Sequence, residues 1–141
     1  MHSKRLKLLL IFGVLPLIVV GKWLTQRLRE KQNEAARYQM ALAECRRAFK
    51  PGTTRGEVEQ HFRIHRTQFK HMCCVTKTET PSATYDDLVK IGQESVPLFC
   101  REHNVYIAFE FNPKSQAEAP ETNDSDILKR MSIFHELQGC P

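Results

Sequence analysis

An apolar run near the N-terminus constrains this chain more than any other feature of its sequence. From Leu6 to Leu24 the only charged residues are Lys7 and Lys22. As a helix, a run of this length spans about 28 Å, which is close to the hydrocarbon thickness of a bilayer. Trp23 has the position expected of an interfacial aromatic residue. The sequence therefore predicts a single transmembrane helix, with residues 1–24 as an N-terminal membrane anchor.

A cleavable secretory signal is the alternative interpretation of the same segment. The basic start and the apolar run from Leu8 to Val20 suit a signal peptide equally well, although Val19 and Gly21 followed by Lys22 make a poor cleavage site. Both interpretations export the rest of the chain. The short N-terminal tail favours a cytoplasmic N-terminus, which leaves the remainder outside the cytoplasm.

The charge distribution argues against a nucleic-acid-binding role. The chain carries a net charge of +5, but residues 1–31 hold seven Lys or Arg residues against one acid, Glu30. The remaining residues hold fourteen basic and fifteen acidic side chains. The basic excess therefore flanks the apolar run, where it suits membrane topology, and a folded domain without it lacks the footprint that nucleic acid needs.

Two helices are predicted before any strand. After Lys22, apolar residues recur at spacings of three, four or seven and form one stripe: Leu24, Leu28, Ala35, Tyr38, Leu42, Cys45 and Phe49. We expect residues 25–44 to form a helical stalk, and Pro51-Gly52 to end the helix. A capping box between Thr54 and Glu57 then starts a short second helix whose Val58 and Phe62 face the core.

The pattern changes to that of strands beyond this helix. Alternation predicts strands at Phe69–Val75 and Val105–Phe111, the second paired in a hairpin with Leu98–Cys100. Lys129–Leu137 is either a last strand or a helix capped within Asp124–Asp126. Thr76–Thr84 is expected to be a loop, and Asn112–Ser125 a mobile segment. The predicted fold class is α+β, with residues 45–141 forming two helices packed on a small antiparallel sheet of three to four strands.

One short stretch resembles a known family. Gly52, Thr54, Arg55, Glu57 and Val58 match the pattern G-x-T-R-x-E-V of the BamE/SmpA-like family of small bacterial envelope proteins, within residues 49–59. The resemblance implies two helices on a three-stranded antiparallel sheet, a bacterial envelope location and a binding role without catalysis. The chain lacks the lipid-bearing cysteine of the outer-membrane members. With the predicted anchor, this suggests a single-pass inner-membrane protein whose domain faces the periplasm.

Five cysteines predict disulfides in an exported domain, and the candidates are Cys45, Cys73, Cys74, Cys100 and Cys140. We expect Cys73 or Cys74 to pair with Cys100 across neighbouring strands, and Cys45 to pair with Cys140. Because adjacent strand residues point to opposite faces, only one of Cys73 and Cys74 can face a given partner. Buried free thiols remain an alternative.

A metal-binding or thiol-redox site is the alternative function. Its ligands would come from the two Cys–His pairs His71, Cys73, Cys100 and His103, a donor set that zinc accepts, although their spacing matches no strong zinc motif. The sequence contains no G-x-S-x-G, H-E-x-x-H, P-loop or dinucleotide-binding motif. We therefore predict no catalytic residues and no cofactor.

A charge asymmetry suggests an interaction surface. Residues 46–77 hold eight basic and two acidic side chains, whereas residues 78–141 hold five basic and eleven acidic ones. The two halves either neutralise each other in the fold or leave a basic face for an acidic partner. The candidate residues of that face are Arg46, Arg47, Arg55, Arg63 and Arg66. The sequence as a whole predicts a protein-binding or scaffolding module that contacts another envelope protein.

Overall fold

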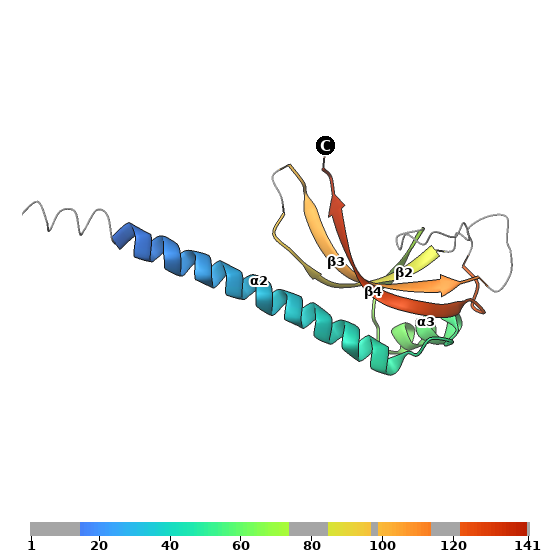
Figure 1. Cartoon of the computed structure of the whole chain (residues 1–141). Helices are drawn as coiled ribbons and strands as arrows, with labels where there is room; N and C mark the ends of the chain where they lie inside the picture. The colour runs from blue at the N-terminus through green and yellow to red at the C-terminus, as the bar shows by residue number, and fades with distance from the viewer. Residues whose placement is uncertain (1–14, 74–84, 97–98, 114–121, 141) are drawn as a thin grey trace, which may run out of the picture. The chain divides into compact units, whose positions relative to one another are not determined.

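The computed structural model describes residues 15–73, 85–96, 99–113 and 122–140. Two helices, α2 (Leu15–Ala48) and α3 (Arg55–Ile64), precede four strands: β1 (Phe69–Cys73), β2 (Tyr85–Gln93), β3 (Glu102–Asn112) and β4 (Ile127–Gln138). The strands form one antiparallel sheet in the order β1-β2-β3-β4 (Figure 1). The chain divides into two compact units, residues 1–37 and residues 38–141. The second unit contains the sheet.

The transmembrane helix predicted at Leu6–Leu24 is wrong for the part of the chain that the structure describes. None of the helices in these residues is both long enough and apolar enough to cross a membrane. The physical reason is the composition of α2, in which Lys22 comes about two turns after Leu15 and a run of Gln, Arg, Glu and Lys residues begins about one turn later. Residues 6–14 of the predicted span lie outside the described residues.

The C-terminal part of α2 and all of α3 pack on one face of the sheet. The predicted apolar stripe is buried at Tyr38, Leu42 and Phe49, whereas its upstream members Leu24 and Leu28 are exposed. Leu42 and Phe49 join one apolar cluster with residues of α3 and of the sheet: Val58, Phe62, Val89, Ile107, Phe109, Phe111, Leu128 and Met131. A smaller cluster on the opposite face contains Leu88, Tyr106 and Ala108.

The predicted start of the second helix is confirmed. The Thr54 hydroxyl accepts a hydrogen bond from the Glu57 amide at 3.4 Å, and the Thr54 amide donates to the Glu57 carboxylate at 2.8 Å. This capping box satisfies two amides that the first turn of a helix otherwise leaves unpaired. Val58 and Phe62 are buried, as the spacing predicted.

The hairpin predicted between Leu98–Cys100 and Val105–Phe111 is wrong. The preceding strand that pairs with β3 is β2, with Leu88 opposite Ala108 and Val89 opposite Ile107, and β4 pairs with the other edge of β3. The segment of β2 does not look like a strand because it contains Asp86 and Asp87, both of which are buried. Residues 129–137 belong to a strand, β4, and not to a helix. The predicted loop Thr76–Thr84 and residues 114–121 of the predicted mobile segment lie outside the described residues.

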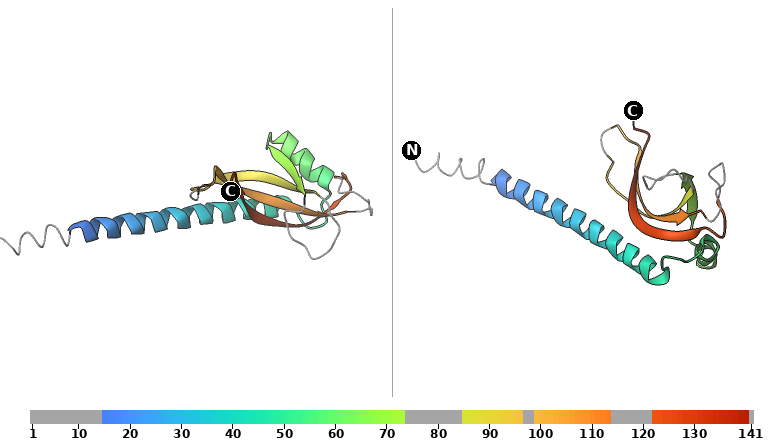
Figure 2. Two further views of the ribbon diagram at one scale, coloured as in Figure 1. Left: turned by 90° about the horizontal axis from the view of Figure 1, so that it is seen from above. Right: turned by 45° about the vertical axis from the view of Figure 1, so that its right-hand side comes forward.

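The sheet is strongly curved along β3 and β4 (Figure 2). The register skips one residue in β2, Ile91, and one residue in β4, Lys129, which lies opposite the step from Glu110 to Phe111 of β3. Such bulges add an unpaired residue and bend the strand that carries it. The curvature separates two ends of the sheet: α3 packs near one end, and the connection from β2 to β3 lies at the other.

Candidate functional site

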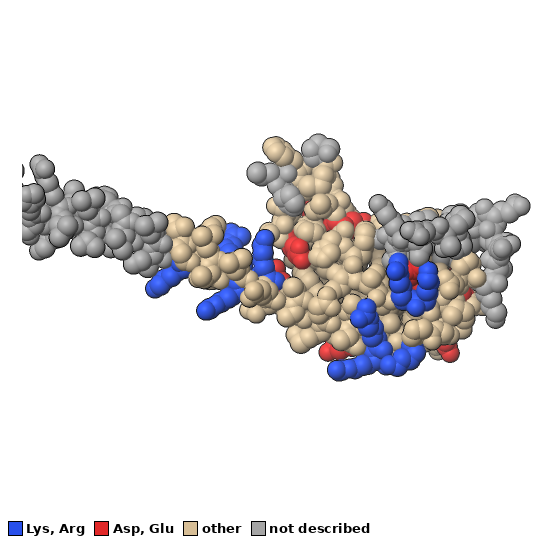
Figure 3. All heavy atoms as spheres, in the orientation of Figure 1, with Lys and Arg blue, Asp and Glu red and all other residues tan. Residues whose placement is uncertain are grey.

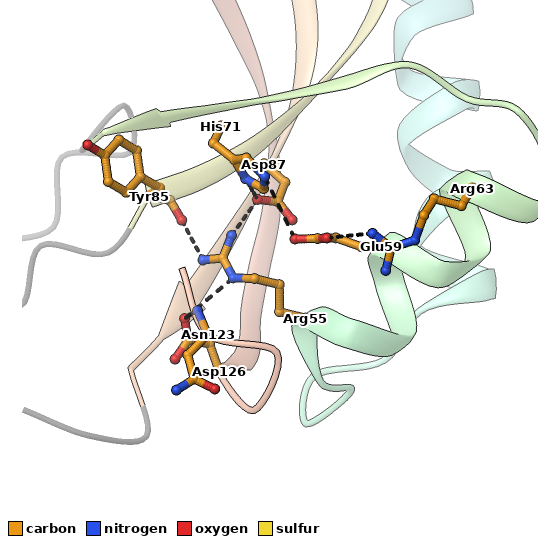
Figure 4. Close-up of polar contacts among 8 residues, drawn as sticks. All are labelled: Arg55, Glu59, Arg63, His71, Tyr85, Asp87, Asn123 and Asp126. Carbon is orange, nitrogen blue, oxygen red and sulfur yellow. Dashed lines mark hydrogen bonds and ion pairs between the residues drawn. The ribbon is translucent and has the colours of Figure 1, made fainter. Parts of the chain in front are cut away.

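A buried ionic network joins α3 to the sheet, and Arg55, the first residue of α3, lies at its centre (Figure 4). The Arg55 side chain is fully buried and forms an ion pair with Asp87 of β2 through Nη1. Its Nη2 donates a hydrogen bond to the carbonyl oxygen of Tyr85. The guanidinium also lies over the Phe111 ring, 4.1 Å from its centroid. These contacts hold the start of α3 against β2 and β3.

A tight turn before β4 supplies the second carboxylate of the network. Asp126 is buried, and its Oδ2 lies 3.4 Å from Arg55 Nε. The same oxygen accepts a hydrogen bond from the Asn123 amide at 3.1 Å, which fixes the carboxylate in the turn. The backbone amide of Arg55 in turn donates to the Asp126 carbonyl oxygen at 2.8 Å. Arg55 therefore connects three segments that are far apart in the sequence.

The outer part of the network reaches solvent. His71 of β1 lies directly opposite Asp87 in the register, and its Nδ1 is 2.9 Å from Asp87 Oδ1. His71 Nε2 is 4.0 Å from Glu59, whose other carboxylate oxygen is 3.1 Å from Arg63. Residues four apart share one side of a helix, so Arg55, Glu59 and Arg63 form a row of alternating charge along α3.

Asp87 has the most perturbed acid–base chemistry in this network. Burial raises the pKa of its carboxyl to about 6, against the opposing effects of Arg55 and His71, and nearby Glu59 acts in the same direction as burial. Its Oδ2 atom is buried without a hydrogen-bond partner among the described residues. The network contains three carboxylates and two guanidinium groups, so one proton on Asp87 balances its charge. We interpret it as a structural ion cluster that exchanges a proton in mildly acidic solution.

A second polar cluster lies at the other end of the sheet. Glu94 follows β2, His103 is in β3 and His135 is in β4, and one ligand atom of each lies within 4.8 Å of those of the other two. The imidazole rings of His103 and His135 have centroids 5.5 Å apart. Glu94 is placed by its backbone amide, which donates to the His103 carbonyl oxygen at 2.8 Å. This cluster brings together groups that the sequence pattern did not connect.

A disulfide closes the same end of the sheet and corrects the predicted pairing. Cys100, just before β3, is bonded to Cys140, just after β4. Cys45 is a free thiol whose pKa is raised mainly by burial, and it is not the partner of Cys140. The prediction failed because it assumed that Cys100 lies in a strand beside Cys73, whereas β2 separates β1 from β3. Cys74 lies outside the described residues.

The predicted metal set His71, Cys73, Cys100 and His103 is not brought together. His71 belongs to the Arg55 network and His103 to the cluster with Glu94, at opposite ends of the sheet. Cys100 is occupied by its disulfide. The sequence did not reveal β2, and without the run from Asp87 to Gln93 in this strand the two histidines cannot be placed relative to each other.

Four of the five residues predicted to form a basic face are exposed, and the fifth, Arg55, is buried. Arg55 is fully buried, Arg63 pairs with Glu59, and Arg46 donates a hydrogen bond to the Met131 carbonyl oxygen at 3.1 Å. Arg47 and Arg66 are exposed. Over the compact unit, Figure 3 shows Lys and Arg side chains in separate groups and not as one continuous patch. Three basic side chains of residues 46–77 form ion pairs with acids of the same fold: Arg55, Arg63 and Lys70.

Apolar side chains are exposed beside the disulfide. Phe99 is 81% exposed and has a φ of 77°, a left-handed conformation that bulky residues rarely adopt. Val96 and Leu137 are also exposed, by 38% and 50%. We name Val96, Phe99, Leu137 and the Cys100–Cys140 bridge the disulfide end of the sheet. Strained backbone conformations cluster at functional sites, and exposed apolar side chains that gather in one place are typical of interaction sites.

Comparison of the chain with protein-family models, with curated proteins and with solved structures finds no match.

Proposed function

We propose that this chain is a protein-binding module of the bacterial envelope, acting in an oxidising compartment and contacting its partner through the disulfide end of the sheet. The exposure of Phe99 next to the Cys100–Cys140 bridge is the observation that carries the proposal. An aromatic side chain offers a large apolar surface, and burying one side chain of this size contributes about 1.5–3 kcal/mol. Aromatic residues are accordingly enriched at the energetic centres of interfaces.

The disulfide supports the choice of compartment. Structural disulfides persist outside the cytoplasm and are rare inside it, where thiols are kept reduced. The bridge closes a loop with a sequence separation of 40 residues, so it restricts a large part of the unfolded chain. The resemblance of residues 49–59 to the BamE/SmpA-like family supports the bacterial envelope as the location.

The disulfide end also has the rigidity expected of a docking surface. The Arg101 amide donates to the Gln138 carbonyl oxygen at 2.9 Å, which continues the β3–β4 ladder up to the bridge. Gly139 has a φ of 65° and lies against Arg101, where an added Cβ would be 2.9 Å from Arg101 Cγ. A site that is held in place before binding loses less conformational entropy when the partner binds.

Site-specific photo-crosslinking in intact cells tests the proposal. A photoreactive phenylalanine analogue replaces Leu137 at the disulfide end, and in a matched control it replaces Ile64, which is 68% exposed at the end of α3. We expect one envelope protein, identified by mass spectrometry, to crosslink at position 137 and not at position 64. A Phe99→Ser substitution in the Leu137 probe should reduce this product by about tenfold or more, in line with the loss of one apolar anchor.

Two outcomes would contradict the proposal. Equal crosslinking from positions 64 and 137 would show that the disulfide end has no special role, and an unchanged product in the Phe99→Ser protein would remove Phe99 from the interface. The compartment is checked separately by alkylating the protein as isolated. Peptides that contain Cys100 and Cys140 should be labelled only after reduction, whereas labelling without reductant would place the domain in a reducing compartment.

A further inference from the structure

We propose that Glu94, His103 and His135 form a binding site for a divalent transition-metal ion, for which Zn²⁺ is the appropriate probe. His103 is in β3 and His135 in β4, and Glu94 directly follows β2, where its amide donates to the His103 carbonyl oxygen. In the register, Val105 lies opposite His135 and Leu137 lies opposite His103. Because side chains alternate between faces, residues 103 and 105 point the same way, and so do residues 135 and 137. His103 and His135 are therefore diagonal neighbours on one face, a relation that permits side-chain contact.

The distances between the polar atoms suit a shared ion better than hydrogen bonds. Glu94 Oε2 lies 3.6 Å from His103 Nδ1 and 3.8 Å from His135 Nδ1. Nitrogen–oxygen hydrogen bonds have lengths of about 2.7–3.2 Å, so neither pair makes a good one. Two ligands on a tetrahedral zinc ion with bonds of about 2.1 Å are separated by about 3.4 Å. All three ligand atoms lie within 4.8 Å of one another, so each pair would have to approach by at most about 1.4 Å to reach the separation found on a zinc ion.

The chemistry of the donor set favours zinc and its neighbours. The two imidazole nitrogens favour Zn²⁺, Cu²⁺ and Ni²⁺ over Mg²⁺ and Ca²⁺, which prefer sites made of oxygen ligands alone, and Zn²⁺ also accepts the carboxylate oxygen. Three protein ligands leave at least one coordination position open for water or for a group from another molecule. The side chains of His103, Glu94 and His135 are 16%, 27% and 47% exposed, so an ion can enter without opening the fold.

The other His–carboxylate cluster of the molecule is a useful contrast. Glu59, His71 and Asp87 also lie within 4.8 Å of one another. There, however, the Asp87 oxygen already binds His71 at 2.9 Å and forms the ion pair with Arg55, and Glu59 pairs with Arg63. A metal ion at this cluster would have to displace the guanidinium groups of Arg55 and Arg63, or bind beside them against the repulsion of their positive charges. Among the described residues, Glu94 has ion-pair contacts with His103 and His135 alone.

The disulfide holds the two histidine-bearing strands together at this point. Cys100 precedes His103 by three residues, and Cys140 follows His135 by five. The bridge therefore limits the separation of β3 and β4 beside the cluster, which reduces the entropy lost when an ion gathers its ligands. The site depends on this local geometry and not on the proposed protein-binding role, and each can fail without the other.

Zinc titration of the full chain tests the site. The protein is purified without a histidine tag, with its disulfide intact, stripped with chelator and titrated with Zn²⁺ in a calorimeter. We expect one ion per chain, and His135→Ala or Glu94→Gln should weaken binding by about 100-fold or more, since loss of a ligand should cost at least as much as loss of an outer-shell partner. His71→Ala is the matched control, because it removes the histidine of the other cluster, and it should leave binding unchanged.

A second readout reports on the ligands directly. Co²⁺ bound in place of Zn²⁺ should give visible absorption bands typical of four-coordinate cobalt with nitrogen and oxygen ligands, and these bands should be absent in the His135→Ala protein. Circular dichroism of each variant without metal verifies that it is folded. The proposal is overturned if the wild-type chain binds no zinc, if His135→Ala and Glu94→Gln bind it normally, or if His71→Ala abolishes binding.

Discussion

Replacement of Arg55 by methionine tests the central feature of the fold. Methionine keeps the unbranched shape of the side chain and removes its charge, so the change isolates the electrostatic role of the guanidinium. The substitution leaves the carboxylates of Asp87 and Asp126 buried without their cation. Removal of one partner of a buried ion pair costs about 3–5 kcal/mol, because the remaining charge keeps its desolvation penalty.

The size of this loss should depend on pH in a defined direction. At pH 7.5 the variant can avoid a buried charge by protonating Asp87. Because burial already raises the pKa of this carboxyl to about 6, adding the proton at pH 7.5 costs about 2 kcal/mol. Without the opposing effect of Arg55 the pKa of Asp87 should rise further, so the folded variant binds a proton more tightly than the folded wild-type protein does. Its stability relative to wild type therefore falls as pH rises. We expect a deficit of about 4 kcal/mol at pH 7.5 and about 2 kcal/mol at pH 5.

Urea unfolding of the full chain, followed by circular dichroism with the disulfide intact, measures both values. The control is Arg63→Met, the same substitution two turns further along α3, where the side chain is 60% exposed and pairs with Glu59. Exposed pairs of this type contribute at most about 0.5 kcal/mol. A deficit below about 1 kcal/mol for Arg55→Met, or one that does not change between pH 5 and pH 7.5, would refute the argument that Arg55 compensates two buried carboxylates.

Three further predictions concern single contacts of the same unit. The Asp87 carboxyl should titrate near pH 6 by carbon NMR of the folded protein, so that its contribution to stability falls as pH rises from about 4 to about 6; a midpoint below 4 would contradict the dominance of burial. Thr54→Ala should cost about 1 kcal/mol in urea unfolding, whereas Thr54→Ser should retain most of the cap. Gly92→Ala should cost about 1–3 kcal/mol, because its Cβ would lie 2.6 Å from the Tyr38 ring, and a double-mutant cycle with Tyr38→Leu should show coupling between the two positions.

The sequence predicted those elements whose signals are local. The capping box at Thr54 and Glu57 marks the start of its helix, because both residues lie within the first turn. The alternation along Val105–Phe111 marks a buried strand, because it involves only residues that follow one another in the chain. The strand β2 was missed because its two aspartates are unfavourable in a strand until a cation from another segment neutralises one of them. Arg55 supplies that cation from thirty-two residues earlier in the chain. The burial of Arg55 could not be predicted from the sequence either, because an arginine in a basic stretch ordinarily lies on the solvated surface.

The candidate site was only partly predictable from the sequence for the same physical reason: its residues meet only when distant strands pair. His103 was identified as a possible ligand, but its partners Glu94 and His135 are nine and thirty-two positions away and meet it only through the register of three strands. The cysteine pairing failed for the same reason, because Cys100 and Cys140 become neighbours only when β3 and β4 are adjacent. Residues that combine through register leave no motif in the sequence.

The residues that match the family pattern and the candidate interaction residues lie at different ends of the sheet. Of the residues that match the family pattern, Thr54 and Glu57 cap α3 and Arg55 fills the buried ionic network, so their roles here are in folding. Phe99 and the cluster of Glu94, His103 and His135 lie beyond Asp87 by about 20 Å of strand. A chain can keep the pattern for stability while the distant end of its sheet varies freely. The proposed binding partner and the proposed metal ion are therefore tested by experiments on residues at the disulfide end, and not on those that match the family pattern.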